Sequence, residues 1–254
     1  MGTATFDYTG QVVLVTGGTR GVGRVIAERF AAAGATVAVC ARSLPEAGLP
    51  GEWLALTADL RDGAQASDMV DAVVAALGRL DVVINNAGGS PPADTTSAPH
   101  RFTERIVALN LLAPIYVSQR ANHHMQTQDG GGAIVNIGSV AATRPAPTVA
   151  AYGAAKAGLA NFTATAAHEW APKVRVNTVT AGLIRTEQAD LHYGDAATIE
   201  RIEATIPVGR LAVPDDIADA CLYLASTSAA YVTGVDLVLH GGGDRPSFLD
   251  AIDG

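Results

Sequence analysis

Short apolar runs rich in β-branched residues alternate with alanine-rich stretches along most of the chain. Runs such as "VVLV" and "AIVNI" are almost continuously apolar, which is typical of strands buried on both faces of a parallel sheet. The pattern predicts seven strands, at Gln11–Val15, Thr36–Cys40, Trp53–Ala58, Val82–Ile84, Ala133–Ile137, Val174–Val179 and Val235–Leu239.

The alanine-rich stretches between these runs have the length and the terminal signals of helices. One leads from a glycine-rich turn to Ala33, where Gly34 ends it. Asp62 is placed to cap another that runs to Leu77 and ends at Gly78. The remaining predicted helices are Thr103–Asn122, in which Pro114 is expected to produce a kink, Ala151–Glu169 and Pro214–Ala225.

Strands that alternate with helices imply right-handed crossovers and a parallel sheet covered on both faces. No linker, composition shift or internal repeat divides the sequence. We therefore expect an α/β chain with a single domain over residues 1–254, a doubly wound, Rossmann-type parallel sheet of seven strands.

The segment Leu183–Val208 interrupts this rhythm, because it is too long for a simple turn. Ile199, Ile202 and Ile206 fall at helical spacing, which predicts a small amphipathic helix. Long insertions are often lids or binding loops, so we expect a substrate lid here, with an ordinary surface excursion as the alternative. Candidate substrate contacts in it are Leu191, His192 and Tyr193.

Composition and charge restrict the protein's partners and its compartment. The 254 residues are 48% hydrophobic and 17% charged, and the formal net charge is −8. Such a chain can bury a large core, and its acidity disfavours binding to nucleic acid or to an anionic membrane. No apolar run approaches the roughly 18 to 20 residues of a membrane span. The start MGTATFDYTGQ does not resemble a secretory signal. We expect a cytoplasmic protein.

Two cysteines, Cys40 and Cys221, lie far apart in the sequence. They belong to no metal-ligand pattern and form no disulfide framework. We expect no metal site.

The first predicted strand is followed by "TGGTRGVG", Thr16–Gly23. Glycines at such a turn allow the backbone to approach a pyrophosphate and to present amides at a helix N-terminus. Their spacing differs from G-x-G-x-x-G and from a P-loop, and a plain strand–helix turn remains the alternative.

The end of the second strand bears on the nucleotide. A site for NAD commonly has an acidic residue there, which binds the ribose hydroxyls. The sequence is instead "CARS", Cys40–Ser43, and the planar cation of Arg42 suits a 2′-phosphate. Arg20 adds a second positive charge, so we predict NADP(H) over NAD(H). The alternative is that Arg42 merely points into solvent.

The chain has only two lysines, Lys156 and Lys173, beside fifteen arginines. Lys156 follows Tyr152 by four residues, so the two side chains share one face of the predicted helix. An ammonium about 4 Å from a phenol favours the phenolate by roughly 4 kcal/mol at an effective dielectric constant near 20. Because desolvation opposes this effect, we expect a smaller net lowering of the Tyr152 pKa. Taken alone, such a pair also fits a solvated helix face.

Together these motifs, in this order, resemble the short-chain dehydrogenase/reductase family over residues 9–243. Thr16–Gly23 resembles the family's TGxxxGxG, and "NNAG", Asn85–Gly88, its motif after the fourth strand. Asp59 matches the acidic residue at the adenine, and Asn110 the asparagine of a central helix. Ser139, with Tyr152 and Lys156 of YxxxK, completes the catalytic set. One departure is Ala181-Gly182, where relatives usually have Pro-Gly.

The resemblance implies roles for individual residues. It gives Tyr152 as general acid or base, Lys156 as the group that acidifies it and holds the nicotinamide ribose, and Ser139 as a hydrogen-bond partner of the substrate oxygen. Asn110 would order a water of the proton relay. The residues implied to bind the cofactor are Gly17, Thr19, Arg20, Gly21, Val22, Gly23, Arg42, Ser43, Asp59, Leu60, Asn86, Ala87, Gly88, Tyr152, Lys156, Gly182, Ile184 and Thr186.

We expect the reaction to interconvert a ketone and a secondary alcohol. The aliphatic residues of the predicted lid favour a partly apolar carbonyl, such as a 3-oxoacyl thioester or a steroid-like ketone. Within the family, the sequence resembles bacterial 3-oxoacyl-thioester reductases and steroid-degrading relatives. The alternatives are a non-catalytic NADP(H)-binding redox sensor and a methyltransferase. The resemblance also implies a homodimer or homotetramer assembled through residues 103–122, 151–169 and 214–239.

Overall fold

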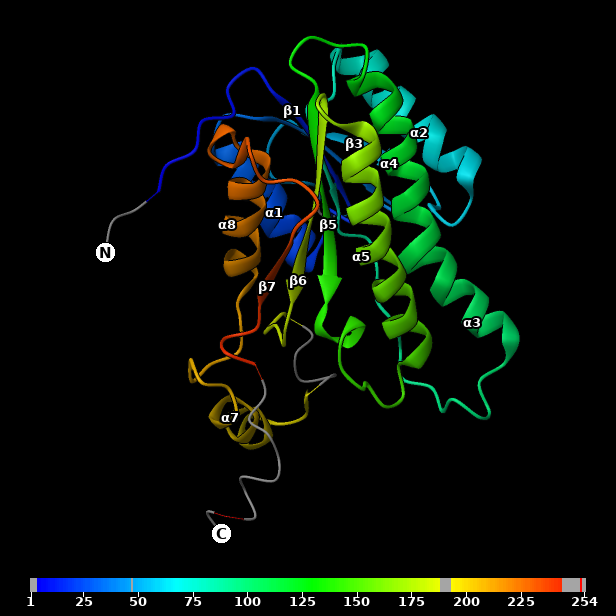
Figure 1. Ribbon diagram of the computed structural model, residues 1–254, viewed down its shortest axis with the longest axis vertical. Coiled ribbons are helices and arrows are strands. Elements are labelled where there is room, and N and C mark those ends of the chain that lie inside the picture. Colours follow the sequence, from blue (N-terminus) through cyan, green and yellow to red (C-terminus); the bar gives the residue numbers. More distant parts are fainter. Residues whose placement is uncertain (1–3, 47, 188–192, 244–251, 253–254) are drawn as a thin grey trace.

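A computed structural model of the protein describes residues 4–46, 48–187, 193–243 and 252 (Figure 1). Its centre is a seven-stranded, all-parallel sheet with the strand order β3-β2-β1-β4-β5-β6-β7. This confirms the predicted doubly wound sheet. The strands are β1 (Val12–Thr16), β2 (Thr36–Ala41), β3 (Leu54–Thr57), β4 (Val82–Asn85), β5 (Gly132–Ser139), β6 (Val174–Ala181) and β7 (Asp236–Leu239).

Helices connect the strands and cover both faces of the sheet. They are α1 (Gly21–Ala32), α2 (Gly63–Leu77), α3 (His100–Val107), α4 (Ala113–Met125), α5 (Ala150–Trp170), α7 (Ala196–Ala204) and α8 (Pro214–Ala225). Shorter turns are η1 (Ala108–Leu112), η2 (Val140–Ala142) and η3 (Thr227–Ala229). Within the described ranges, no helix is long and apolar enough to span a membrane.

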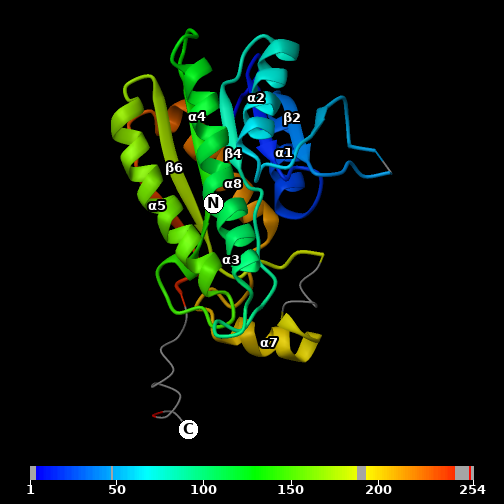
Figure 2. The ribbon, with the colours of Figure 1, turned by 90° about the vertical axis from the view of Figure 1, so that its right-hand side faces the viewer.

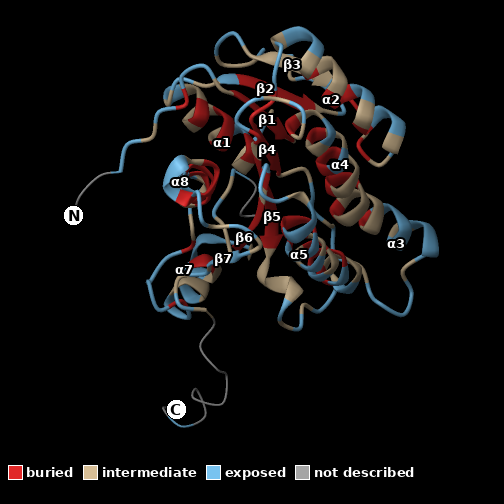
Figure 3. Cartoon of the chain, turned by 45° about the horizontal axis from the view of Figure 1, so that its top comes forward, coloured by how far each residue is buried: buried red, intermediate tan, exposed pale blue. Residues whose placement is uncertain are grey.

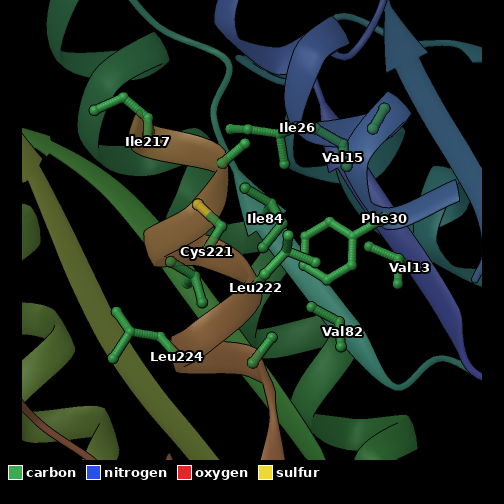
Figure 4. Packing of buried hydrophobic residues seen from close by; sticks show 14 of the residues in the cluster. Val13, Val15, Ile26, Phe30, Val82, Ile84, Ile217, Cys221, Leu222 and Leu224 are labelled. Atoms are coloured by element: carbon green, nitrogen blue, oxygen red, sulfur yellow. The ribbon is translucent and has the colours of Figure 1, made fainter. Parts of the chain in front are cut away.

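Two apolar layers hold the sheet between its helices. On one face, α1 and α8 pack on the central strands, where Ile26 and Phe30 meet Ile217 and Leu222 (Figure 4). The opposite face is covered by α2, α4 and α5 (Figure 2). The central strands are therefore buried on both sides (Figure 3), which explains why their sequences are apolar throughout rather than alternating.

The predicted helix Thr103–Asn122 is interrupted. The chain forms α3, then the π-helical turn η1, then α4, and Pro114 lies in the first turn of α4. Proline has no N–H to donate to the carbonyl of Asn110, four residues earlier. The Ala113 N–H instead bonds to the carbonyl of Ala108, five residues back. The predicted helix is therefore interrupted by a widened turn just before Pro114, and the kink itself stays a prediction.

The segment after β6 contains the predicted amphipathic helix as α7. Ile199 and Ile206 are buried and pack with Leu211, while Ile202 lies partly buried at the edge of this cluster. The helix lies beyond the carboxyl ends of the strands (Figure 1).

Candidate active site

A cavity of about 570 Å³ opens at the carboxyl ends of the strands. In the strand order, β1 and β4 are the neighbours from which the chain continues in opposite directions, and ligands of doubly wound sheets bind at such a point. The cavity walls contain these residues predicted to bind the cofactor: Gly17, Thr19, Arg20, Gly21, Val22, Gly23, Arg42, Ser43, Asp59, Leu60, Asn86, Ala87, Gly88 and Thr186.

The glycine turn brings β1, α1 and the loop after β4 into close contact. Gly17 has a φ of 64°, in the region that favours glycine, and a Cβ there would lie 3.1 Å from the Ala87 Cα. A Cβ on Gly23 would overlap the Gly17 carbonyl and the Asn86 side chain. These glycines therefore let the turn after β1 pack closely against the loop after β4. The cavity that they line lies at the start of α1, where a helix presents unpaired amides.

Thr16 joins the glycine turn to the loop after β4. Sequence reasoning did not single it out as a site residue. The Thr16 hydroxyl accepts hydrogen bonds from the backbone N–H groups of Asn86 and Ala87, both at 3.0 Å. The Asn86 side chain donates to the Thr16 carbonyl at 3.0 Å. The signal was available, because Thr16 is the first residue of TGxxxGxG.

At the other end of the cavity, Arg42 and Ser43 are exposed on its wall, as is Arg20. The Asp59 carboxylate is paired with Arg61, whose Nε donates to Oδ1 at 2.8 Å. This hydrogen bond is the main reason that the pKa of Asp59 is lowered, and the positive charge of Arg42 adds to the effect. Arg42 therefore lies near Asp59. Arg61 was not among the residues predicted from the sequence.

Ser139, Tyr152 and Lys156 come together from β5 and α5. The Ser139 hydroxyl lies close enough to the Tyr152 hydroxyl to lower the pKa of Tyr152. The Lys156 Nζ lies 5.7 Å from the centroid of the Tyr152 ring and donates to the Ile137 carbonyl at 2.7 Å. Only 4% of Lys156 is exposed, so a charged amine is held almost entirely inside the protein.

The pKa values around this group show one expectation to be wrong for the cofactor-free protein. Burial raises the pKa of Tyr152, and among its neighbours the Ser139 hydrogen bond is what lowers it. Burial also lowers the pKa of Lys156, to about 8. The predicted net lowering at Tyr152 is wrong, because desolvation of the buried phenol outweighs the lowering by Ser139 and Lys156 is not among the groups that shift this pKa.

Asn110 lies in η1 and is fully buried. Its side chain accepts from the Gly89 N–H at 2.8 Å and donates to the carbonyls of Gly89 and Ile106, at 3.0 and 2.9 Å. A Cβ on Gly88 would lie 2.8 Å from the Asn110 Oδ1 and 3.4 Å from the Lys156 Nζ. The Asn110 amide thus holds the loop after β4 through backbone groups, and Gly88 of this loop lies between Asn110 and Lys156.

A row of buried polar side chains fixes α5 against the sheet behind Lys156. Asn85 donates to Asn136 at 2.8 Å, and Asn136 donates to Thr163 of α5 at the same distance. Thr178 of β6 donates to the same Thr163 hydroxyl at 3.1 Å. These bonds determine where the helix that carries Tyr152 lies on β5 and β6.

The loop after β6 returns along the segment before α8. Gly182 donates to the Leu239 carbonyl at 2.8 Å, and Ile184 forms a parallel bridge with Ala212. Gly182 and Ile184 lie outside the described lining of the cavity, as do Tyr152 and Lys156, whereas Thr186 lies in it. Tyr193 accepts a hydrogen bond from the Ile184 N–H at 3.2 Å. Leu191 and His192 lie outside the described residues.

The cavity wall also contains residues that sequence reasoning missed. Leu44 and Pro45 extend the wall beyond Ser43, Leu109 contributes from η1, and Glu187 follows Thr186. None of them belongs to a spacing pattern, so the motifs alone could not have found them.

Comparison with known proteins fits this geometry. A family profile described as enoyl-(acyl carrier protein) reductase matches residues 16–243. The D-threitol dehydrogenase of Mycolicibacterium smegmatis is 35% identical over 246 residues, which cover 93% of this chain and 94% of that protein. The solved structure of a short-chain dehydrogenase/reductase from Serratia marcescens matches with a TM-score of 0.83 and 31% identity, covering 92% of this chain and 98% of that one. The chain belongs to the short-chain dehydrogenase/reductase family.

As a short-chain dehydrogenase/reductase, the protein is an oxidoreductase that acts between CH–OH and C=O groups, and the family uses a nicotinamide cofactor. A further relative, the 3β-hydroxysteroid dehydrogenase 1 of Eggerthella lenta, is 33% identical over 250 residues, 93% of this chain and 94% of that protein. The names of these relatives cover both a polyol and a steroid.

Proposed function

We propose that the protein is an NADP(H)-dependent reductase or dehydrogenase in which Tyr152 is the general acid or base. The observation that supports this most directly is the meeting of Ser139, Tyr152 and Lys156 beside a glycine-floored cavity. The cavity suits a nicotinamide nucleotide, because Gly17, Gly21 and Gly23 line it at the start of α1, where the amides of a helix are unpaired. When bound, the nicotinamide supplies or accepts the hydride.

The residues of the chain manage the proton at the substrate oxygen. In reduction, the Tyr152 hydroxyl donates a proton to the oxygen on which negative charge develops. A phenol whose pKa is raised by burial stays protonated at neutral pH and is ready for this direction. Ser139 donates a hydrogen bond to the same oxygen and stabilises its charge. Lys156, when protonated, favours the tyrosinate that remains.

The preference for NADP(H) rests on the charges at the far end of the cavity. Arg42 and Arg20 are exposed on the wall, and Asp59, whose pKa Arg42 lowers, is already paired with Arg61. Within the described ranges neither Arg20 nor Arg42 forms an ion pair, so both charges could meet a 2′-phosphate. A guanidinium binds phosphate oxygens with two parallel hydrogen bonds.

For the substrate, we propose a partly apolar ketone or secondary alcohol, of the 3-oxoacyl thioester or steroid-like kind. The steroid-acting relative supports this choice, and the polyol-acting one points to smaller substrates. The isoleucines of the predicted lid give weaker support for an apolar substrate than expected. Ile199 of α7 and Ile206, just after it, are buried against Leu211 rather than presented to a ligand. Turnover with NADPH across steroid, 3-oxoacyl and sugar carbonyls distinguishes these classes.

The test of the catalytic role is Tyr152→Phe, compared with Tyr231→Phe on the fully exposed Tyr231. Removing a general acid is expected to lower kcat by about 10²- to 10⁴-fold. The Kd for NADPH should stay within about twofold, since a single ring hydroxyl is lost. Near-wild-type turnover in Tyr152→Phe would rule out Tyr152 as the proton donor. Steady turnover by the wild type would exclude the non-catalytic sensor, which the comparisons do not support.

A further inference from the structure

The backbone of Ile184 has one edge turned away from the rest of its strand pair. The Leu183 carbonyl accepts from the Ala212 N–H at 3.0 Å, and the Arg185 N–H donates to the Ala212 carbonyl at 2.8 Å. Both groups therefore face Ala212. In an extended chain the peptide groups of successive residues alternate in direction, so the N–H and C=O of Ile184 face the opposite way.

The Ile184 N–H on that edge is already engaged by a side chain. It donates to the Tyr193 hydroxyl at 3.2 Å. The Tyr193 ring is partly buried and packs on the apolar cluster of Ile199, Ile206 and Leu211. Burial raises the pKa of Tyr193, so the group is a neutral hydroxyl at physiological pH.

Tyr193 also lies within electrostatic range of the catalytic phenol, because a negative charge on it would raise the pKa of Tyr152. Tyr193 thus contacts the loop after β6 on the side of the proposed reaction centre.

We propose that the Tyr193 hydroxyl competes with the nicotinamide carboxamide for the Ile184 N–H. This inference rests on the proposed function. The resemblance to the family implies that Ile184 binds the cofactor. A carboxamide has one acceptor oxygen and two N–H donors, which match the N–H and the C=O on this edge of Ile184. Since the Ile184 N–H is a single donor, binding of the carboxamide there requires the Tyr193 hydroxyl to leave it. Tyr193 is therefore a positioning residue that weakens binding of the nicotinamide end alone.

The test compares two ligands on the variant Tyr193→Phe, which keeps the ring and its packing. Without the competing hydroxyl, NADP⁺ should bind about two- to tenfold more tightly, the equivalent of one hydrogen bond. Adenosine 2′,5′-bisphosphate lacks the nicotinamide, so its Kd should not change. Tyr231→Phe is the matched control and should change neither value. Both Kd values are measured by titration calorimetry on the full chain.

The possible outcomes separate this inference from the proposed function. If Tyr193→Phe binds NADP⁺ no more tightly than the wild type, while the bisphosphate binds normally, the competition is refuted and the proposed function stands. Equal tightening of both ligands would refute it as well, because the effect would then not be confined to the nicotinamide end. If the wild type binds neither ligand, the proposed function is overturned and this inference with it.

Discussion

The Lys156 amine is buried and has few hydrogen-bond partners to replace the water that it loses on folding. Only the Ile137 carbonyl is recorded as its hydrogen-bond partner among the described residues. The folded protein therefore favours the neutral amine, and the Lys156 pKa falls from 10.5 to about 8. Such a residue costs stability, which fits a group kept for chemistry at the proposed site.

The lowered pKa predicts how stability depends on pH. Because the folded-state pKa is below the unfolded one, the contribution of Lys156 is least favourable below pH 8 and improves as the pH rises toward 10.5. Between pH 7 and 9.5 the wild type should gain about 2 kcal/mol from this group. Urea unfolding at both pH values should show that gain, and Lys156→Met should lack it. Parallel pH profiles for the two proteins would contradict the prediction.

Arg42 is the residue on which the cofactor preference can be tested. Arg42→Gln removes the charge and the guanidinium fork, so the KM for NADPH should rise by about tenfold, the equivalent of one charge-assisted hydrogen bond. The KM for NADH, which has no 2′-phosphate, should change by less than about twofold. Arg105→Gln on exposed α3 is the control and should alter neither value. An equal rise for both cofactors would show that Arg42 does not distinguish them.

Individual residues differ in how far their sequence reveals them. Gly17 and Gly23 belong to a motif with a characteristic spacing, and both line the cavity. The spacing of Tyr152 and Lys156 predicted that they share one helix face, and the Lys156 amine does lie beside the Tyr152 ring. The bond from Ile184 to Tyr193 joins residues nine positions apart, and no periodicity of the sequence encodes it. The direction of the Tyr152 pKa shift was missed for another reason, since spacing gives proximity but says nothing of desolvation.

Among the elements, the π-helical turn η1 could not be predicted from the sequence. The missing N–H of Pro114 predicts a disturbance, but a helix can respond by bending or by taking an extra residue into the turn. Here the turn takes in an extra residue, and the same turn contains the buried Asn110, whose side chain bonds to the Gly89 backbone. The choice depends on a loop 21 residues earlier in the chain, which a local pattern does not report.

Asn110→Ala should therefore loosen the loop after β4. The substitution leaves the Gly89 N–H and C=O without their partner, which should lower the free energy of unfolding by about 2 kcal/mol. Because Gly88 lies between Asn110 and Lys156, kcat should fall as well. Asn161→Ala, on the exposed side of α5, is the control and should leave chemical denaturation and turnover unchanged. Unaltered stability in Asn110→Ala would show that these bonds add nothing net.

For the molecule as a whole, the apolar runs predicted the number of strands and the two helical layers, because burial on both faces removes the alternation of polar residues. Strand order and register are set by contacts between distant segments, such as Val13 beside both Val37 and Val82. The preference for right-handed crossovers reduces the number of possible strand orders, and the resemblance to the family selects one of them.

The edge of the sheet at β7 leads to a prediction about assembly. Val238 of β7 is 43% exposed, Tyr223 of α8 is 37% exposed, and Tyr231, between η3 and β7, is fully exposed. Exposed apolar side chains and an edge strand both favour association with another chain. These residues lie in the predicted contact region 214–239, so we expect a dimer or tetramer, with a mass by light scattering at least twice the 25.9 kDa of one chain.

Val238→Lys tests whether this edge is part of the interface. A lysine on each partner would bring charges into an apolar contact, so the variant should shift toward smaller species as it is diluted. Val208→Lys is a matched control, because Val208 is 61% exposed but lies outside the predicted contact regions. The two variants should differ in mass while keeping the same thermal unfolding at high concentration. A monomeric wild type would refute the assembly, whereas an unchanged Val238→Lys oligomer would move its interface to α4 and α5.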